Sequence, residues 1–69
     1  MEMVSIIVNG REERVLEGTT LLEMVEKRGL SPERVVAELN FQIIGKESWS
    51  DCRLKAQDSI ELVGFVGGG

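Results

Sequence analysis

The sequence predicts an α+β fold, in which a small mixed sheet packs against one helix. Three observations indicate it: a hairpin turn signal at Asn9-Gly10, a helix start at Thr20, and an apolar strand at 59–63 near the end of the 69 residues. In a chain this short, a helix that connects a hairpin to a later strand crosses one face of the sheet. The order of these signals therefore predicts a two-layer domain.

The first element is a β-hairpin. An apolar, β-branched run at 4–8 and a second strand at 12–16 flank Asn9-Gly10, and both turn residues tolerate the positive φ of a type I′ turn. Alternation along the first strand directs Ile6 toward the core and Ile7 away from it. Ile7 is then either open to a partner or covered by another part of the twisted sheet.

The helix has a start signal and a stop signal. Thr20 and Glu23 match a capping box, in which each side chain accepts a hydrogen bond from the other residue's backbone N–H. Gly29 supplies the left-handed residue that ends the helix, and Leu30 behind it closes back on Val25. The predicted apolar face of this two-turn helix comprises Leu21, Leu22 and Val25, with Met24 as core filler at its edge.

The second half of the chain predicts shorter elements. Ser31-Pro32 begins a 3₁₀ turn with Ser31 as N-cap, and a strand follows at 35–39. Asn40 ends that strand, 43–44 forms a short one, and 46–52 is a loop or short helical turn with Trp49 at the core edge. Leu54 is an apolar anchor, and 56–58 forms a turn before the last strand. This order predicts a β-grasp, or ubiquitin-like, fold with a mixed sheet of four to five strands.

Size and composition limit the function. We expect one domain at 1–64 and a flexible tail at 65–69, because three consecutive glycines lose much conformational freedom on ordering. A hydrophobic fraction of 42% with three aromatic residues leaves a small aliphatic core and no room for a walled substrate cleft. Catalysis by this chain alone is not expected.

Charge and residue usage exclude several classes of protein. Twelve acidic against eight basic residues argue against nucleic-acid binding. The absence of histidine and of a phosphate loop argues against a metal site or a bound cofactor. No apolar run approaches a membrane span, and the first residues do not form a signal peptide, so we expect a soluble protein of a reducing cytoplasm.

Two groups have chemistry of their own. Cys52 lies between Asp51, which would raise its thiol pKa, and Arg53, which would lower it; it is either a plain thiol or a persulfide carrier. The other group is a carboxylate on Gly69, at the end of a tail that is either merely frayed or built to enter a partner's active site. Gly67 to Gly69 can extend by ~10 Å without any Cβ atom to obstruct a narrow channel. A carboxylate becomes a good electrophile only when activated, for example by adenylation.

Five short motifs follow one another along the chain. They are Val8-Asn9-Gly10, Glu17-Gly18-Thr19-Thr20-Leu21, Val36-Ala37-Glu38-Leu39-Asn40, Glu47-Ser48-Trp49 and Phe65-Val66-Gly67-Gly68-Gly69. In the order and spacing of these motifs the chain resembles, over nearly its whole length, the ThiS family, the sulfur carriers of thiazole formation in thiamine biosynthesis. Two positions depart from the family pattern: Phe41 follows Asn40 where glycine is usual, and Gln57 stands before Asp58 where glycine is common.

The resemblance implies a carrier rather than an enzyme. Gly69 would be adenylated by a ThiF-like activating enzyme that uses ATP and Mg²⁺, and then converted to a thiocarboxylate with sulfur from a donor such as a cysteine desulfurase. A ThiG-like thiazole synthase would receive the sulfur. Gly68 would be the other glycine of the family's diglycine end, and Phe65, Val66 and Gly67 would contact partners.

Other functions fit the same features. A molybdopterin synthase small subunit and a carrier for tRNA thiolation or amino-acid synthesis have the same fold and diglycine end. A ubiquitin-like modifier would form isopeptide bonds through Gly69, and a plain interaction module would carry an inert tail. The short length and Glu47-Ser48-Trp49 favour the thiamine assignment.

Overall fold

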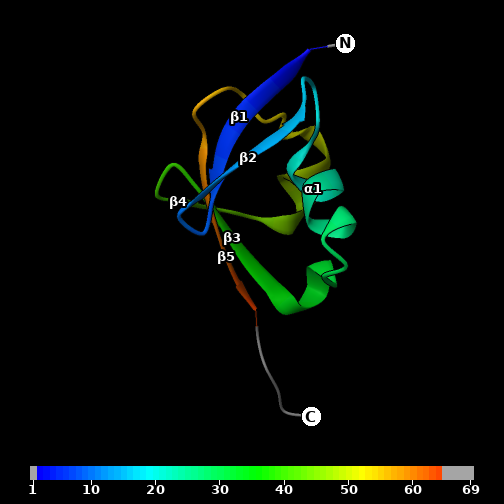
Figure 1. Ribbon diagram of the computed structural model, residues 1–69. Coiled ribbons are helices and arrows are strands. Elements are labelled where there is room, and N and C mark those ends of the chain that lie inside the picture. Colours follow the sequence, from blue (N-terminus) through cyan, green and yellow to red (C-terminus); the bar gives the residue numbers. More distant parts are fainter. Residues whose placement is uncertain (1, 65–69) are drawn as a thin grey trace.

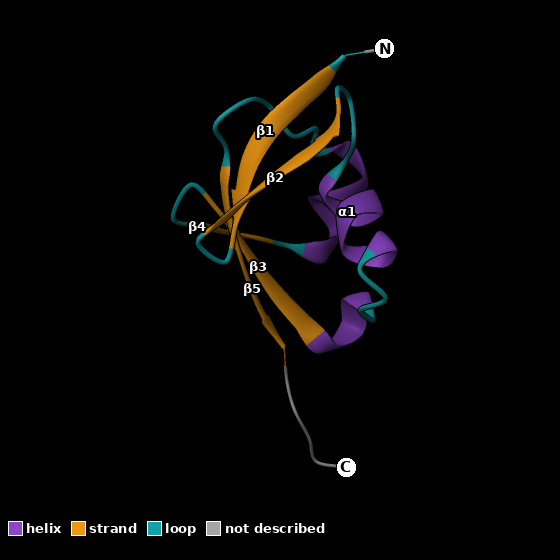
Figure 2. Cartoon of the chain, viewed as in Figure 1, coloured by secondary structure: helices purple, strands orange, loops and turns teal. Residues whose placement is uncertain are grey.

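The computed structural model describes residues 2–64, which form a five-stranded mixed sheet with helices on one face. Figures 1 and 2 show the strands on one side of the molecule and the helices on the other. The elements in chain order are β1 (Met3–Val8), β2 (Arg11–Leu16), α1 (Leu21–Lys27), η1 (Pro32–Arg34), β3 (Val35–Leu39), β4 (Gln42–Ile44), η2 (Lys46–Asp51) and β5 (Ser59–Gly64), where η denotes a 3₁₀ helix.

The last strand lies in the middle of the sheet. The strand order is β2-β1-β5-β3-β4. β5 is parallel to β1 and antiparallel to β3, while β2 and β4 pair antiparallel at the two edges. The predicted mixed sheet is therefore confirmed, with five strands. The predicted tail, 65–69, lies outside the described residues.

The hairpin and the helix form as their local signals predict. Asn9 and Gly10 have φ values of 51° and 82°, as a type I′ turn requires. The Glu23 N–H donates to Thr20 Oγ1 at 3.1 Å and the Thr20 N–H donates to Glu23 Oε1 at 2.9 Å, which confirms the capping box. At the other end, Gly29 has φ 78° and the Leu30 N–H donates to the Val25 carbonyl at 3.4 Å.

The core lies between α1 and the inner face of the sheet. Its buried residues come from the three inner strands β1, β3 and β5, from α1, from η2 and from the segment after η2. They are Ile6, Val8, Leu21, Met24, Val25, Val35, Ala37, Trp49, Leu54 and Ile60. Ile7 is half-buried on the other face, so that face is covered in part at this position.

Of three single-residue predictions, two are confirmed and one was wrong. Met24 is buried in the core, as expected of core filler, whereas Leu22 on the predicted apolar face is half-buried. Trp49 is 1% exposed, so it lies within the core rather than at its border, and its Nε1 donates to the Ile44 carbonyl at 2.9 Å. Ser31 occupies the predicted N-cap position of η1, with Pro32 directly after it, although the Ser31 side chain makes no capping hydrogen bond.

The segment after η2 is fastened to the start of α1. The Leu21 N–H donates to the Cys52 carbonyl at 2.8 Å, and the Leu54 N–H donates to the Thr19 carbonyl at 2.9 Å. Arg53 adds a side-chain bond from Nη1 to the Gly18 carbonyl at 2.9 Å. These contacts hold the irregular segment 52–54 against the helix and leave Leu54 buried.

Candidate functional site

The candidate site begins where β5 ends, at Gly64. Its pairing with Val35 is the last step of a ladder that starts at Ile60 opposite Leu39. A Cβ atom placed on Gly64 would come no closer than 4.0 Å to a neighbouring atom, the Arg34 carbonyl oxygen. The end of the strand is therefore held in register by β3 without being crowded, and it projects beyond the β1–β2 hairpin (Figure 1).

The hairpin turn supports this strand from its other side. β1 pairs only with the beginning of β5, through Ile7 with Ser59 and Val8 with Ile60. Beyond that point, the Asn9 N–H donates to the Ile60 carbonyl at 2.9 Å, and Asn9 Oδ1 accepts the Leu62 N–H at 2.8 Å. Asn9 thus continues the pairing after β1 has ended. The sequence indicates Asn9 as a turn residue, and this second role depends on a contact 53 residues away.

A second asparagine fixes the beginning of β5. The Asn40 side chain donates from Nδ2 to Asp58 Oδ1 at 3.1 Å and accepts the Ser59 N–H at 3.0 Å. Its backbone N–H also donates to the Ser59 carbonyl, at 2.7 Å. Asp58 in turn accepts the Lys55 N–H at 2.8 Å, which closes the turn before β5. Local propensity predicts Asn40 as a strand end, but its contacts with Asp58 and Ser59 were not foreseen.

Both departures from the usual glycine pattern fall at left-handed residues. Asn40 and Phe41 have φ values of 50° and 73°, and Gln57 has φ 73°. Non-glycine residues adopt this conformation at a cost in free energy. Phe41 and Gln57 therefore adopt, with side chains, the backbone conformation that glycine adopts most readily.

The residues that the sequence indicates for chemistry and partner contact lie beyond this anchored strand. They are Phe65, Val66, Gly67, Gly68 and Gly69, and all five lie outside the described residues. What the described part of the chain provides is their attachment point. A five-residue segment can extend at most about 18 Å from Gly64 at ~3.3–3.6 Å per residue.

Cys52 has a different environment from the one its sequence neighbours predict. Partial burial raises the pKa of the Cys52 thiol, the Asp58 carboxylate raises it further, and Lys55 offsets a smaller part. Asp51 and Arg53 are not the controlling charges, so that prediction was wrong. A raised pKa leaves less thiolate at neutral pH, which disfavours nucleophilic sulfur chemistry at this residue.

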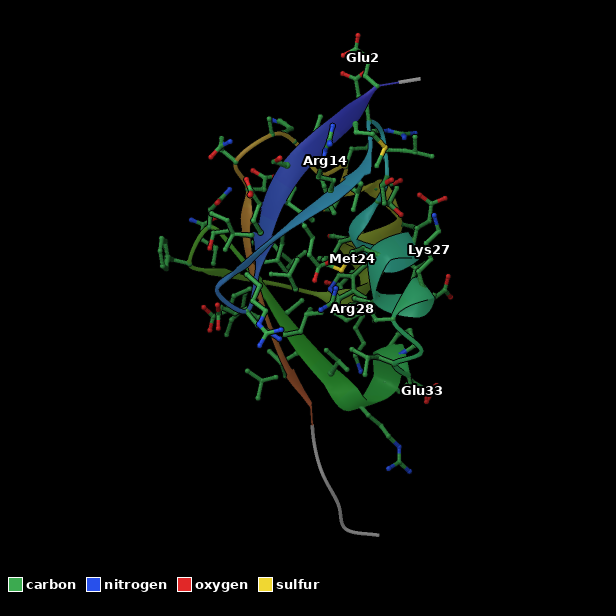
Figure 3. The ribbon with its side chains drawn as sticks, in the orientation of Figure 1. Glu2, Arg14, Met24, Lys27, Arg28 and Glu33 are labelled. Atoms are coloured by element: carbon green, nitrogen blue, oxygen red, sulfur yellow. The ribbon has the colours of Figure 1, made fainter. Side chains whose placement is uncertain are left out.

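A groove of the described domain lies elsewhere. It has a volume of about 380 Å³, opens between β2 and α1, and includes Met3, Leu16 and Met24 in its lining. Figure 3 shows the lining residues Arg14 on β2, Met24 and Lys27 on α1, and Arg28 directly after α1. Because β1 and β5 are parallel, Met3 and Gly64 lie at opposite ends of the sheet. The groove is therefore remote from the attachment point of 65–69.

Residues 2–64 contain no group of three or more acidic, cysteine or histidine residues placed to hold a metal ion. None of their helices is long and apolar enough to cross a membrane.

The family comparison matches almost the entire chain. The ThiS family model aligns with residues 3–69. The chain belongs to the ThiS family. The match includes the β1–β2 hairpin, the capping box of α1 and the glycine segment, so it extends through the candidate site and is not limited to the folded domain.

Individual relatives of two kinds are similar to this ThiS family member. The sulfur carrier protein ThiS of Bacillus subtilis is 36% identical over 63 residues, which cover 90% of this chain and 96% of that protein. The thiazole synthases of Magnetococcus marinus and Paramagnetospirillum magneticum are 33% and 27% identical over 66 residues. In both synthases the matched region covers 96% of this chain but only 20% of the relative, so the chain spans about a fifth of their length.

A solved structure has the same fold. The crystal structure of the thiamine biosynthesis protein ThiS from Geobacter metallireducens superposes with a TM-score of 0.81 at 28% identity. The superposition covers 96% of this chain and all of that one. This confirms the β-grasp prediction for this ThiS family member.

Proposed function

We propose that this protein is a sulfur carrier for thiazole formation in thiamine biosynthesis. The observation that carries the proposal is that the ThiS family match extends through Gly69 and therefore includes the glycine segment. The Bacillus subtilis relative named as a sulfur carrier, matched over 96% of its length, supports the same assignment. The two thiazole synthases that contain a related segment support a thiazole synthase as the acceptor.

In this proposal the folded domain presents Gly69 to its partners. A ThiF-like enzyme uses ATP and Mg²⁺ to adenylate the Gly69 carboxylate, with release of pyrophosphate. The terminal sulfur of a persulfide, formed by a donor such as a cysteine desulfurase, then attacks the acyl carbon and displaces AMP. A thiol reductant cleaves the resulting acyl disulfide, and the thiocarboxylate is released. The protein is acted on by its partners in each step, and Gly67 and Gly68 leave room for a narrow active-site channel.

The fold supports this role through the anchoring of β5. The strand is paired with β3 up to Gly64 and bonded to Asn9 on its other side. Because its base is fixed, the position of residues 65–69 relative to the domain is limited by the length of the segment. Phe65 and Val66 follow the strand directly and are proposed to contact the partners.

Intact mass measurement after co-expression with a ThiF-like enzyme and a sulfur source tests the proposal. The expected result is a shift equal to the replacement of one oxygen by sulfur, mapped to Gly69 by fragmentation. Mapping is necessary because oxidation of any of the three methionines adds nearly the same mass. A shift located at Cys52, or one that survives deletion of Gly69, would contradict the proposal.

Two variants serve as controls in that experiment. Cys52→Ser should acquire sulfur as the wild type does, since the thiol is not the proposed acceptor. Adding one alanine after Gly69 should abolish the modification, because the reactive carboxylate is displaced. Transfer of the sulfur into a thiazole product by a thiazole synthase separates the thiamine role from a related sulfur-carrier pathway.

A further inference from the structure

Large apolar side chains are exposed on the strand side of the domain, away from the helices. Among the described residues, Phe41, Ile43 and Val63 are the most exposed large hydrophobic residues, at 87%, 71% and 55%. Phe41 lies in the turn between β3 and β4, Ile43 on β4 and Val63 near the end of β5. Apolar residues gathered on one side of a small protein are characteristic of an interaction surface.

Strand register joins these residues into one surface. Ile43 lies opposite Glu38, and Glu38 lies opposite Glu61, so β4, β3 and β5 contribute one row. The next row pairs Val36 with Val63. Val35, Ala37 and Ile60 point into the core. Because side chains alternate along a strand, the five residues of these two rows point away from α1. We name Val36, Glu38, Ile43, Glu61 and Val63 the outer patch.

The centre of the outer patch carries two like charges. Glu38 and Glu61 are direct cross-strand partners, an arrangement that destabilises an isolated sheet. Within residues 2–64, the ion pair that forms is Arg28 with Glu13, on the helix side of the molecule. A basic side chain from another molecule would relieve the repulsion between Glu38 and Glu61.

Phe41 is held rigidly beside this patch. Asn40 and Phe41 both adopt left-handed φ values, 50° and 73°. The three hydrogen bonds of Asn40 to Asp58 and Ser59 keep the turn in this conformation. Because the backbone of this turn is already fixed, less conformational entropy is lost when the exposed Phe41 side chain enters a pocket.

We propose that the outer patch and Phe41 together form a docking surface for a protein with an apolar pocket and an adjacent basic side chain. Phe41 occupies the pocket, and the basic group faces Glu38 and Glu61. A second copy of this chain does not fit, because a two-fold contact would set one glutamate pair against the other. Val63 is two residues from Phe65, so a protein bound here lies next to the base of 65–69.

The choice of partner rests on the proposed function. Two thiazole synthases contain a segment similar to this chain within one polypeptide. Docking through the outer patch would raise the effective concentration of the glycine segment at such a partner. The probe is therefore purified thiazole synthase from the same genome, titrated with the full chain.

Substitutions on the docking surface test the proposal. Phe41→Ala and Phe41→Gly should each weaken binding by about tenfold or more, as expected for an aromatic anchor. Phe41→Gly suits the positive φ of the turn, so it should stay folded even if Phe41→Ala does not. The double variant Glu38→Gln with Glu61→Gln should weaken binding at low salt and flatten its salt dependence. Met3→Ala, an exposed apolar residue at the other end of the sheet, should bind within about twofold of the wild type.

The outcomes of these experiments test the docking surface separately from the proposed sulfur-carrier function. Binding that is absent in the wild type, or unchanged in Phe41→Gly and in the double glutamate variant, would overturn the docking surface. Self-association that Phe41→Gly abolishes would also overturn it, because the patch would then serve a second copy. If Gly69 acquires sulfur but synthase binding is unchanged in the docking-surface variants, the carrier role stands and the docking surface does not. If binding depends on the docking surface but Gly69 acquires no sulfur, only the docking surface stands.

Discussion

Asn9 Oδ1 accepts the backbone N–H of Leu62 at 2.8 Å, across 53 residues of sequence. This bond connects the first turn of the chain to the strand from which the glycine segment emerges. It lies where β1 has ended, so no strand pairing on that side replaces it. One side chain therefore contributes both to the hairpin and to the fixed direction of β5.

Asn9→Gly should weaken the end of β5 without opening the hairpin. Glycine tolerates the φ of 51° at this position but lacks the side-chain acceptor. We expect a loss of about 1 kcal/mol in the free energy of unfolding. Amide hydrogen exchange at Leu62 should accelerate by more than the exchange of amides in α1, which reports the global loss of stability. Equal changes at Leu62 and in α1 would contradict the specific role of this bond.

Thr20→Ala should destabilise the domain through the lost cap of α1. Thr20 Oγ1 accepts the Glu23 N–H at 3.1 Å, and the helix has only seven residues over which to distribute the loss. The expected cost is about 1 kcal/mol, measured by urea unfolding. Thr20→Ser keeps the acceptor and is the matched control. If the alanine and serine variants unfolded at the same urea concentration, the cap would not contribute.

Glu23 should make the stability of the domain depend on pH in the acid range. The hydrogen bond that the Thr20 backbone donates to Glu23 lowers the pKa of Glu23 below its ordinary value of 4.5. The Thr20 side chain and the charges of Lys27 and Arg53 lower this pKa further, although desolvation opposes the shift. The carboxylate therefore stabilises the fold above that value, and its contribution is lost as the pH falls through the lower native pKa. Thermal unfolding of Glu23→Gln should show a smaller decrease over this range. A decrease of the same size in both proteins would assign the acid sensitivity to other carboxylates.

Cys52 should react slowly with an aromatic disulfide reagent in the folded protein. Burial, together with Asp58, raises the pKa of its thiol above the ordinary value of 9.0. The reaction rate should therefore rise at higher pH in the folded chain than in the same chain unfolded in urea. Between the two pKa values the unfolded chain loses the proton first, so stability should fall as pH rises. A folded profile that coincides with the unfolded one would show that the thiol environment is not perturbed.

Much of the secondary structure follows from residues within four positions of one another. Asn9-Gly10 determines a type I′ turn because both residues accept positive φ, and Thr20 with Glu23 determines a helix start because their bonds close locally. Gly29 ends the same helix because glycine readily adopts the left-handed conformation found there, with φ 78°. These signals predict the order of elements, and the order together with the short chain length predicts the β-grasp fold.

The packing of the second half could not be predicted in this way. Trp49 is flanked by polar residues, so its sequence context indicates a position at the core edge, yet within residues 2–64 it is the largest fully buried side chain. Its indole N–H can be buried only because the Ile44 carbonyl lies 2.9 Å away. The polarity of neighbouring residues carries no information about such a partner.

The sequence by itself determined the hairpin and the capped helix, because each depends on the conformational preferences of adjacent residues. Only the tertiary structure decided that Asn9 and Asn40 hold β5, and that Glu38 and Glu61 lie side by side next to exposed Ile43. These relationships depend on which strands are neighbours and in what register. The free energy that selects the register comes from the burial of the common core, to which residues far apart in the sequence contribute together.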